Sequence, residues 1–124
     1  MAANRIRVAA PGGDYDILIE PGILQRLKND RGAALGAAVT GNKIVVVTNT
    51  TIAPLYGEAL VAALPDAALV TMPDGEPYKT LATVAKLYTD LVAVGLDRSG
   101  TILALGGGVV GDTAGFAAAT YLRG

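Results

Sequence analysis

The residues best suited to chemistry in this sequence are a glycine-rich segment and the carboxylate that follows it. Gly106-Gly107-Gly108-Val109-Val110-Gly111 has the spacing G-x-G-x-x-G, and Asp112 comes directly after it. Where such a segment joins a strand to a helix, its bare backbone can approach a diphosphate while the first amides of the helix face the anion. Because no Gly-Lys-Ser/Thr follows the glycines, a Walker P-loop is excluded. The spacing is therefore compatible with a dinucleotide site.

The same residues also fit a purely structural role. Gly111 and Gly115, one turn apart, would let a helix pack closely on a sheet. Asp112 would complement the helix dipole in the first turn, or it would accept hydrogen bonds from ligand hydroxyls. Dinucleotide folds usually carry the motif in their first strand-helix turn, with an acidic residue about 20 positions later, whereas here it lies in the last unit. Both interpretations stay open on these residues alone.

The region around the glycines is apolar enough to suggest a membrane span. From Thr101 to Leu122 there are 22 residues with one charge, Asp112. A charge at the centre of a span costs roughly 2.5–3.5 kcal/mol, and the glycine triplet would interrupt a continuous helix. A strand, a glycine turn and a helix fit the segment better.

Composition limits the classes of function. With 124 residues, 52% of them hydrophobic, we expect a single domain over residues 1–124 with one core. A net charge of -1 and scattered Lys and Arg argue against nucleic acid as a partner. The sequence has no Cys and no His, so it lacks thiolate metal sites and the commonest catalytic bases and zinc ligands. The N-terminus resembles no signal peptide, and we expect a cytoplasmic protein.

Hydrophobic periodicity predicts alternating strands and helices. Period-two spacing on either side of residues 11–14 predicts an N-terminal hairpin. Strands are predicted at residues 43–48, 67–72 and 101–105, with a weak helix at 23–35, a loop at 36–42 and a final helix after the glycines. Two further helices are predicted from apolar faces formed by Ile52, Leu55, Tyr56, Ala59, Leu60 and Ala63, ending at Pro65, and by Leu81, Val84, Ala85, Tyr88, Leu91 and Val92, ending near Gly95. The predicted fold class is α/β: a Rossmann-like open parallel sheet with flanking helices and an N-terminal β-hairpin.

Ligands of such sheets bind at the carboxyl ends of the strands, so the segments that follow the strands should share one edge. These segments are Thr48-Asn49-Thr50, Pro73 to Lys79, and Gly106 to Asp112. Structural alternatives exist here as well. Thr48 and Asn49 could cap the next helix, and Pro77 suits a first helical position with Glu76 as its cap.

Two longer segments carry a resemblance to a known family. "PDGEPYKTL" from Pro73 and "LGGGVVGDTAGFAAATYLRG" from Leu105, together with "VTNTTIAPLYG" from Val47, resemble the N-terminal, nucleotide-binding half of the 3-dehydroquinate synthase family, within the sugar-phosphate cyclases. The resemblance covers essentially the whole chain. Pro77 departs from the family pattern, and it should stiffen the loop without removing a side-chain contact.

The resemblance implies a shikimate-pathway lyase of aromatic amino acid biosynthesis. Such an enzyme converts 3-deoxy-D-arabino-heptulosonate 7-phosphate to 3-dehydroquinate and phosphate, with NAD used catalytically and regenerated. It also implies a divalent metal, zinc or cobalt, whose ligands lie in a C-terminal helical domain outside these 124 residues. We therefore expect a piece of a longer enzyme, inactive alone, with no catalytic residue or metal ligand of its own. The further expectations are a small-molecule substrate, a homodimer at full length, and neither nucleic acid nor membrane as a partner.

Site residues follow from the resemblance position by position. The implied cofactor contacts are Thr48, Asn49, Asp74, Gly75, Glu76, Pro77, Tyr78, Lys79, Gly107, Gly108, Val109, Val110, Gly111 and Asp112. Arg123 is the implied contact to the substrate phosphate or carboxylate. Three alternatives remain: another sugar-phosphate cyclase, an NAD-dependent polyol dehydrogenase, and a stand-alone nucleotide-binding module.

Overall fold

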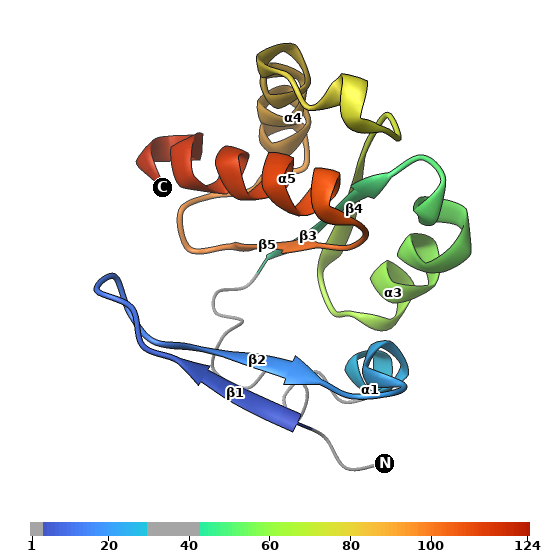
Figure 1. Ribbon diagram of the computed structural model, residues 1–124. Helices are drawn as coiled ribbons and strands as arrows, with labels where there is room; N and C mark the ends of the chain where they lie inside the picture. Colours follow the sequence, from blue (N-terminus) through green and yellow to red (C-terminus); the bar gives the residue numbers. More distant parts are fainter. Residues whose placement is uncertain (1–3, 30–42) are drawn as a thin grey trace. The chain divides into compact units, whose positions relative to one another are not determined.

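A computed structural model describes residues 4–29 and 43–124, which fall into two compact units, residues 1–36 and 37–124. In the first unit β1 (Asn4–Val8) pairs antiparallel with β2 (Tyr15–Ile19), and α1 (Ile23–Asn29) follows (Figure 1). The predicted hairpin is confirmed, and the weak helix is confirmed as far as Asn29. The rest of that predicted helix and the predicted loop at 36–42 lie outside the described residues. The expectation of one domain over residues 1–124 stays a prediction.

The hairpin is held by charged side chains on its surface. Asp16 on β2 accepts hydrogen bonds from Arg5, at 2.6 Å, and from Arg7, at 3.1 Å, both on β1. The hydrogen bond from Arg7 lowers the pKa of Asp16, and the charge of Arg5 adds to the effect. These cross-strand pairs supplement the main-chain ladder of a two-stranded sheet, which is marginally stable by itself.

The second unit contains a parallel sheet in the order β4-β3-β5. Its strands are β3 (Ile44–Asn49), β4 (Ala67–Met72) and β5 (Thr101–Ala104). All six residues of β3 are buried, as expected for a central strand covered on both faces. The three predicted strands are confirmed to within one residue at either end.

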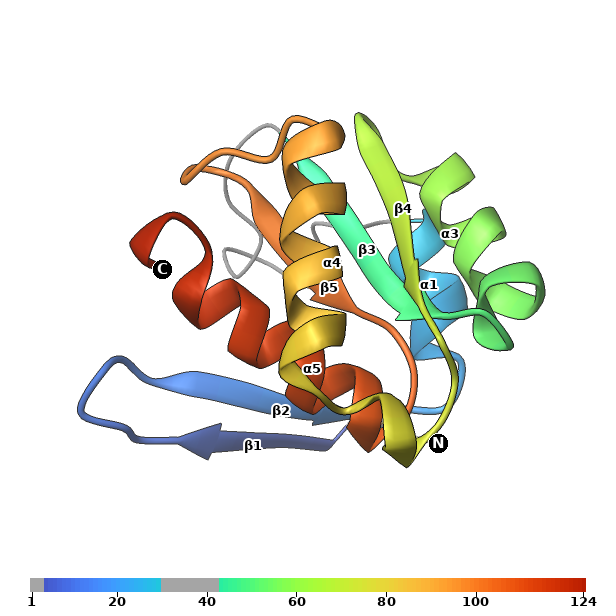
Figure 2. The same ribbon diagram turned by 90° about the horizontal axis from the view of Figure 1, so that it is seen from above.

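Helices cover both faces of this sheet. α4 (Leu81–Ala93) and α5 (Gly108–Thr120) lie together on one face, and α3 (Glu58–Ala63) lies on the other (Figures 1 and 2). The main core forms under α4 and α5 from Val45, Val47, Val70, Met72, Val84, Leu87, Leu91, Leu96, Val110, Ala114 and Ala117. The predicted α/β class is therefore confirmed, with a Rossmann-like sheet between two helical layers.

The helix after β3 differs from its prediction. It begins with a π-helical turn, Ala53–Gly57, before α3, and it buries Ala53, Gly57 and Leu60. Leu55 and Tyr56, predicted on the inner face, are 64% and 54% exposed, and the predicted residues Ala59 and Ala63 are exposed as well. A π turn holds more residues than an α turn, so it shifts the helical phase that a 3.6-residue period assumes.

The inner face of α4 is only partly the predicted one. α4 buries Val84 and Leu91 as predicted, and also Leu87, whereas the predicted residues Leu81, Ala85 and Val92 are exposed. It ends at Ala93, two residues before Gly95, whose φ of +81° and hydrogen bond from its amide to the Val92 carbonyl agree with the stop predicted near Gly95. Thr80, rather than Glu76, is the side chain that caps α4, accepting from the amide of Thr83 at 3.2 Å.

Candidate functional site

The three segments after the parallel strands meet at the carboxyl edge of the sheet, as predicted. Asn49, the last residue of β3, donates a hydrogen bond to Asp74, after β4, at 3.2 Å. Lys79, at the end of the second segment, lies 2.8 Å from Asp112 on α5. Parallel strands bring loops far apart in sequence to one edge because every strand ends on the same side. The candidate site is this edge.

The N-terminus of α5 lies open at this edge. Gly107 is its N-cap, and among the described residues no side chain caps the first amides. A Cβ at Gly107 or Gly108 would meet no atom within 4 Å. Helix N-terminal amides without intrahelical partners form a site for an anion, and the missing side chains leave their backbone approachable.

Gly106 has a different reason to be glycine. Its φ is +123°, and an added Cβ would lie 2.7 Å from Cδ1 of Ile52 and 3.5 Å from Oγ1 of Thr48. The backbone conformation therefore demands glycine there, and packing adds the smaller demand that the Ile52 methyl move aside. Neither demand applies to Gly108, the first residue of α5.

The structural alternatives for the later residues of the motif are wrong. Gly111 and Gly115 do not bring α5 close to the sheet, because a Cβ at either position would meet nothing within 4 Å. Asp112 is the fifth residue of α5, beyond its first turn, and it pairs with Lys79 instead of capping the helix. Neither side of the Lys79–Asp112 ion pair is buried: the side chains are 38% and 68% exposed.

The ammonium group of Lys79 has two carboxylate neighbours. Besides its contact with Asp112, it lies 3.6 Å from the carboxylate of Glu76. The hydrogen bond to Asp112 raises the pKa of Lys79; desolvation opposes this effect, and the charges of Asp112 and Glu76 add to it. Lys79 therefore stays protonated throughout the neutral range, beside the carboxylates of Asp112 and Glu76.

The side chain of Asn49 also stabilises the turn after β3, in addition to its predicted contact with the cofactor. Its side-chain oxygen accepts from the amides of Thr51, at 3.0 Å, and Ile52, at 2.8 Å. These bonds shape the turn that leads into the helix, but the N-cap of that helix is Ile52, without a side-chain cap, so Asn49 is not the cap residue of the structural alternative. Thr51, which our sequence analysis did not single out, donates its hydroxyl to Asp74 at 2.7 Å. A segment extended by one residue past Thr50 would have included it.

Three predicted site residues have side chains that are poorly placed to contact a ligand at this edge. Thr48 is fully buried, and its hydroxyl, under Gly106, has no partner in the described part of the chain. Val110 is buried in the core, which leaves only its backbone for a ligand. Arg123 follows the far end of α5, whose 13 residues span about 20 Å from the glycine turn. The structure does not bring Arg123 together with the other site residues.

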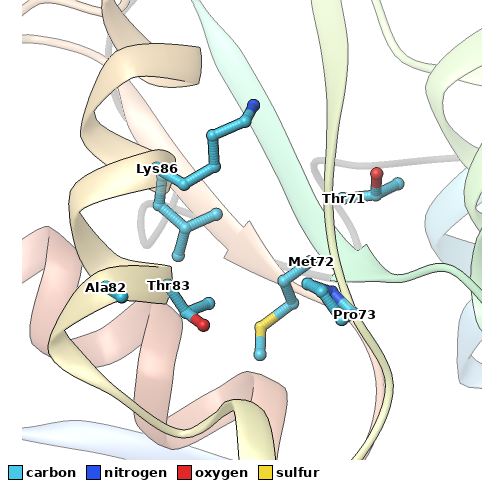
Figure 3. A pocket seen from close by; sticks show the side chains of 7 residues that line it. Thr71, Met72, Pro73, Ala82, Thr83 and Lys86 are labelled. Carbon is cyan, nitrogen blue, oxygen red and sulfur yellow. The ribbon is translucent and has the colours of Figure 1, made fainter.

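Two cavities border the region. One of about 380 Å³ lies between α4 and α5 and is lined by Lys79, Thr80, Leu81, Val84, Asp112, Thr113 and Phe116. The other, of about 220 Å³, lies between the end of β4, with Met72 and Pro73, and α4 (Figure 3). Its polar side chains from α4 have partners, since Lys86 pairs with Asp90 at 2.6 Å and the hydroxyl of Thr83 lies 3.2 Å from that of Thr80. The second cavity therefore offers an apolar surface rather than a polar site.

The described residues include no group of three or more His, Cys, Asp or Glu side chains that could hold a metal ion. In the same residues, no helix is long and apolar enough to cross a membrane.

Fold and edge together define a class: a Rossmann-like α/β protein with an open helix N-terminus and a lysine at the carboxyl ends of its strands. Residues 69–124 match the family described as 3-dehydroquinate synthase N-terminal. The chain is 47% identical over 128 residues to a 3-dehydroquinate synthase of Citrifermentans bemidjiense, an alignment covering 100% of this chain and 34% of that protein. A 3-dehydroquinate synthase of Pelotomaculum thermopropionicum is 48% identical over 114 residues, covering 89% of this chain and 30% of that protein. The chain belongs to the 3-dehydroquinate synthase family, and it spans about a third of the length of these relatives.

Solved structures of sugar-phosphate cyclases share the fold. A 2-epi-5-epi-valiolone synthase from Streptomyces hygroscopicus, with NAD+ and Zn2+ bound, is 30% identical with a TM-score of 0.71, covering 94% of this chain and 32% of that one. A 2-deoxy-scyllo-inosose synthase complexed with carbaglucose-6-phosphate, NAD+ and Co2+ has a TM-score of 0.74 over 98% of this chain and 33% of that one. At 23% identity, the second similarity supports the fold alone.

Proposed function

We propose that the carboxyl edge of this sheet binds NAD. The observation that carries the proposal is the N-terminus of α5, where uncapped amides lie beside two glycines that neither conformation nor packing requires. Gly107, Gly108 and Val109 would contact the diphosphate through their backbone, and Lys79 would add a positive charge nearby. NAD would supply hydride transfer, and these residues would bind and orient it.

The remaining contacts of the proposal come from the other two segments. Glu76 would face a ribose, and Asn49 would lie beside the adenosine end. Asp112 would accept a hydrogen bond from the cofactor in addition to its contact with Lys79. The proposed cofactor surface also includes two buried residues that lie beneath it, Thr48 and Val110. Its remaining members are Asp74, Gly75, Pro77, Tyr78 and Gly111.

The whole protein is proposed to be a 3-dehydroquinate synthase. It would convert 3-deoxy-D-arabino-heptulosonate 7-phosphate to 3-dehydroquinate and phosphate, with Arg123 contacting the substrate and with a zinc or cobalt ion held by residues outside this chain. Identities of 47–48% to relatives of that name, against 30% to the valiolone synthase, support this choice among sugar-phosphate cyclases. A cytoplasmic homodimer completes the proposal.

A titration of NAD into the purified chain, followed by calorimetry, tests the binding site. We expect NAD to bind more tightly than ATP, and Gly108→Ala to weaken it because a methyl group would stand before the amides. Gly115→Ala is the matched control, since it makes the same change on the open surface of α5, two turns farther on. Equal affinity for NAD in wild type and Gly108→Ala, or equal binding of ATP, would contradict the proposal.

A further inference from the structure

Asp74 is held by two side chains, one from the last residue of β3 and one from the turn that follows it. One carboxylate oxygen accepts from the hydroxyl of Thr51 at 2.7 Å, and the other accepts from the side-chain amide of Asn49 at 3.2 Å. Asn49 is itself fixed by the amides of Thr51 and Ile52. The end of β3 and the turn after it therefore hold Asp74 through both of its oxygens.

Only a short, stiff segment separates Asp74 from Lys79. Gly75 makes the turn with a φ of +120°, and the residues Glu76–Tyr78 form one 3₁₀ turn that contains Pro77. The amide of Tyr78 donates to the Gly75 carbonyl at 3.1 Å, and that of Lys79 donates to Glu76 at 3.0 Å. Because Pro77 and the two turn hydrogen bonds restrict the torsions from Glu76 to Lys79, this turn moves as a unit, and holding Asp74 limits where Lys79 can lie.

We propose that Thr51 is a positioning residue for the cofactor: by holding Asp74, it places the Glu76–Lys79 turn against α5. This inference rests on the proposed NAD site and gives Asp74 an indirect part in it. Both Thr51 and Asp74 are exposed, so their hydrogen bond contributes little to the stability of the core. Loss of this hydrogen bond should therefore change the position of the Glu76–Lys79 turn rather than the stability of the fold.

The test compares Thr51→Val, which removes the hydroxyl and keeps the branched shape, with Thr51→Ser, which keeps the hydroxyl. Thr89→Val is the control, because Thr89 lies on α4 and bonds the carbonyl of Ala85 in its own helix. Calorimetry with NAD, thermal unfolding, and amide hydrogen exchange at Tyr78 and Lys79 without ligand are measured on the full chain. We expect Thr51→Val to weaken NAD about threefold to tenfold and to speed exchange at both amides, with an unchanged melting temperature. Thr51→Ser and Thr89→Val should behave as wild type.

A double-mutant cycle assigns the effect to Asp74. In an Asp74→Ala background, Thr51→Val should cause no further loss of NAD affinity, because the group that it holds is absent. Additive losses would overturn the inference, as would a Thr51→Ser variant as weak as Thr51→Val. If the wild-type chain bound no NAD, the proposed cofactor site would fail. Unchanged exchange at Tyr78 and Lys79 in Thr51→Val would overturn the positioning role separately.

Discussion

Gly106 and Gly108 should respond oppositely to the same substitution. Alanine at Gly106 would force a side chain into a φ of +123° and bring its Cβ to 2.7 Å from Cδ1 of Ile52. The isoleucine methyl can rotate away, but the backbone strain remains, and it costs about 1–3 kcal/mol. We therefore expect Gly106→Ala to lower the free energy of unfolding by about that amount.

Alanine at Gly108 meets neither obstacle. The position opens α5, and a Cβ there has no atom within 4 Å. Because alanine is the better helix former by up to about 1 kcal/mol, Gly108→Ala should leave the free energy of unfolding unchanged or raise it slightly. Its methyl group would keep a phosphate from the first amides. Loss of one hydrogen bond to a charged group, about 1.5–3 kcal/mol, corresponds to a weakening of NAD binding by about 10-fold to 150-fold.

Urea unfolding followed by circular dichroism gives the stability of each variant, and calorimetry of the folded protein gives its affinity for NAD. The reasoning would be refuted if Gly108→Ala destabilised the chain as much as Gly106→Ala while binding NAD as wild type does. That result would mean that Gly108 is glycine for structural reasons.

Four further outcomes are expected. Asp112→Asn should weaken the binding of NAD about threefold to tenfold with little change in melting temperature, because its pair with Lys79 is exposed. Calorimetry measures the affinity and thermal unfolding the melting temperature, and an unchanged affinity would contradict this prediction. Since the pKa of Lys79 is raised, its stabilising pair is complete below the unfolded pKa and is lost as pH rises through the folded pKa. NAD affinity should thus stay flat from about pH 6 to pH 9 and fall only in stronger alkali, and a decline near neutrality would exclude Lys79 as the relevant charge. Thr80→Ala should lower the free energy of unfolding by about 1 kcal/mol through loss of the α4 cap, whereas Thr89→Ala should change it less in the same urea titration. The purified chain should release no phosphate from 3-deoxy-D-arabino-heptulosonate 7-phosphate, with or without zinc, because it contains no His; release above the blank in a phosphate assay would contradict this.

The parts of the fold that depend on local pattern could be predicted from the sequence. The β-branched segment at 43–48 is central and buried because both faces of a middle strand need apolar side chains. The stop at Gly95 follows from the positive φ that a helix end requires. The convergence of the three segments followed from topology alone, since parallel strands end at one edge.

Other features depend on geometry that periodicity does not contain. The π turn at Ala53–Gly57 changes the phase of its helix and exposes Leu55 and Tyr56. The pairing of Lys79 with Asp112 joins residues 33 positions apart, so the sequence could give only their shared edge. The hydrogen bond from Thr51 to Asp74 was missed for the same reason.

The glycines that local structure does not explain point most directly to a ligand. Glycine in a helix costs about 0.8–1 kcal/mol relative to alanine, and α5 contains Gly108, Gly111 and Gly115 without a steric need for any of them. At Gly108 the bare backbone lies among the uncapped amides, so close approach of an anion accounts for it. Gly115 lies about 10 Å farther along the axis, beyond reach of a group bound at those amides. The two positions therefore need different explanations, and the neutral effect on NAD expected for Gly115→Ala separates the cofactor surface of α5 from the remainder of its exposed face.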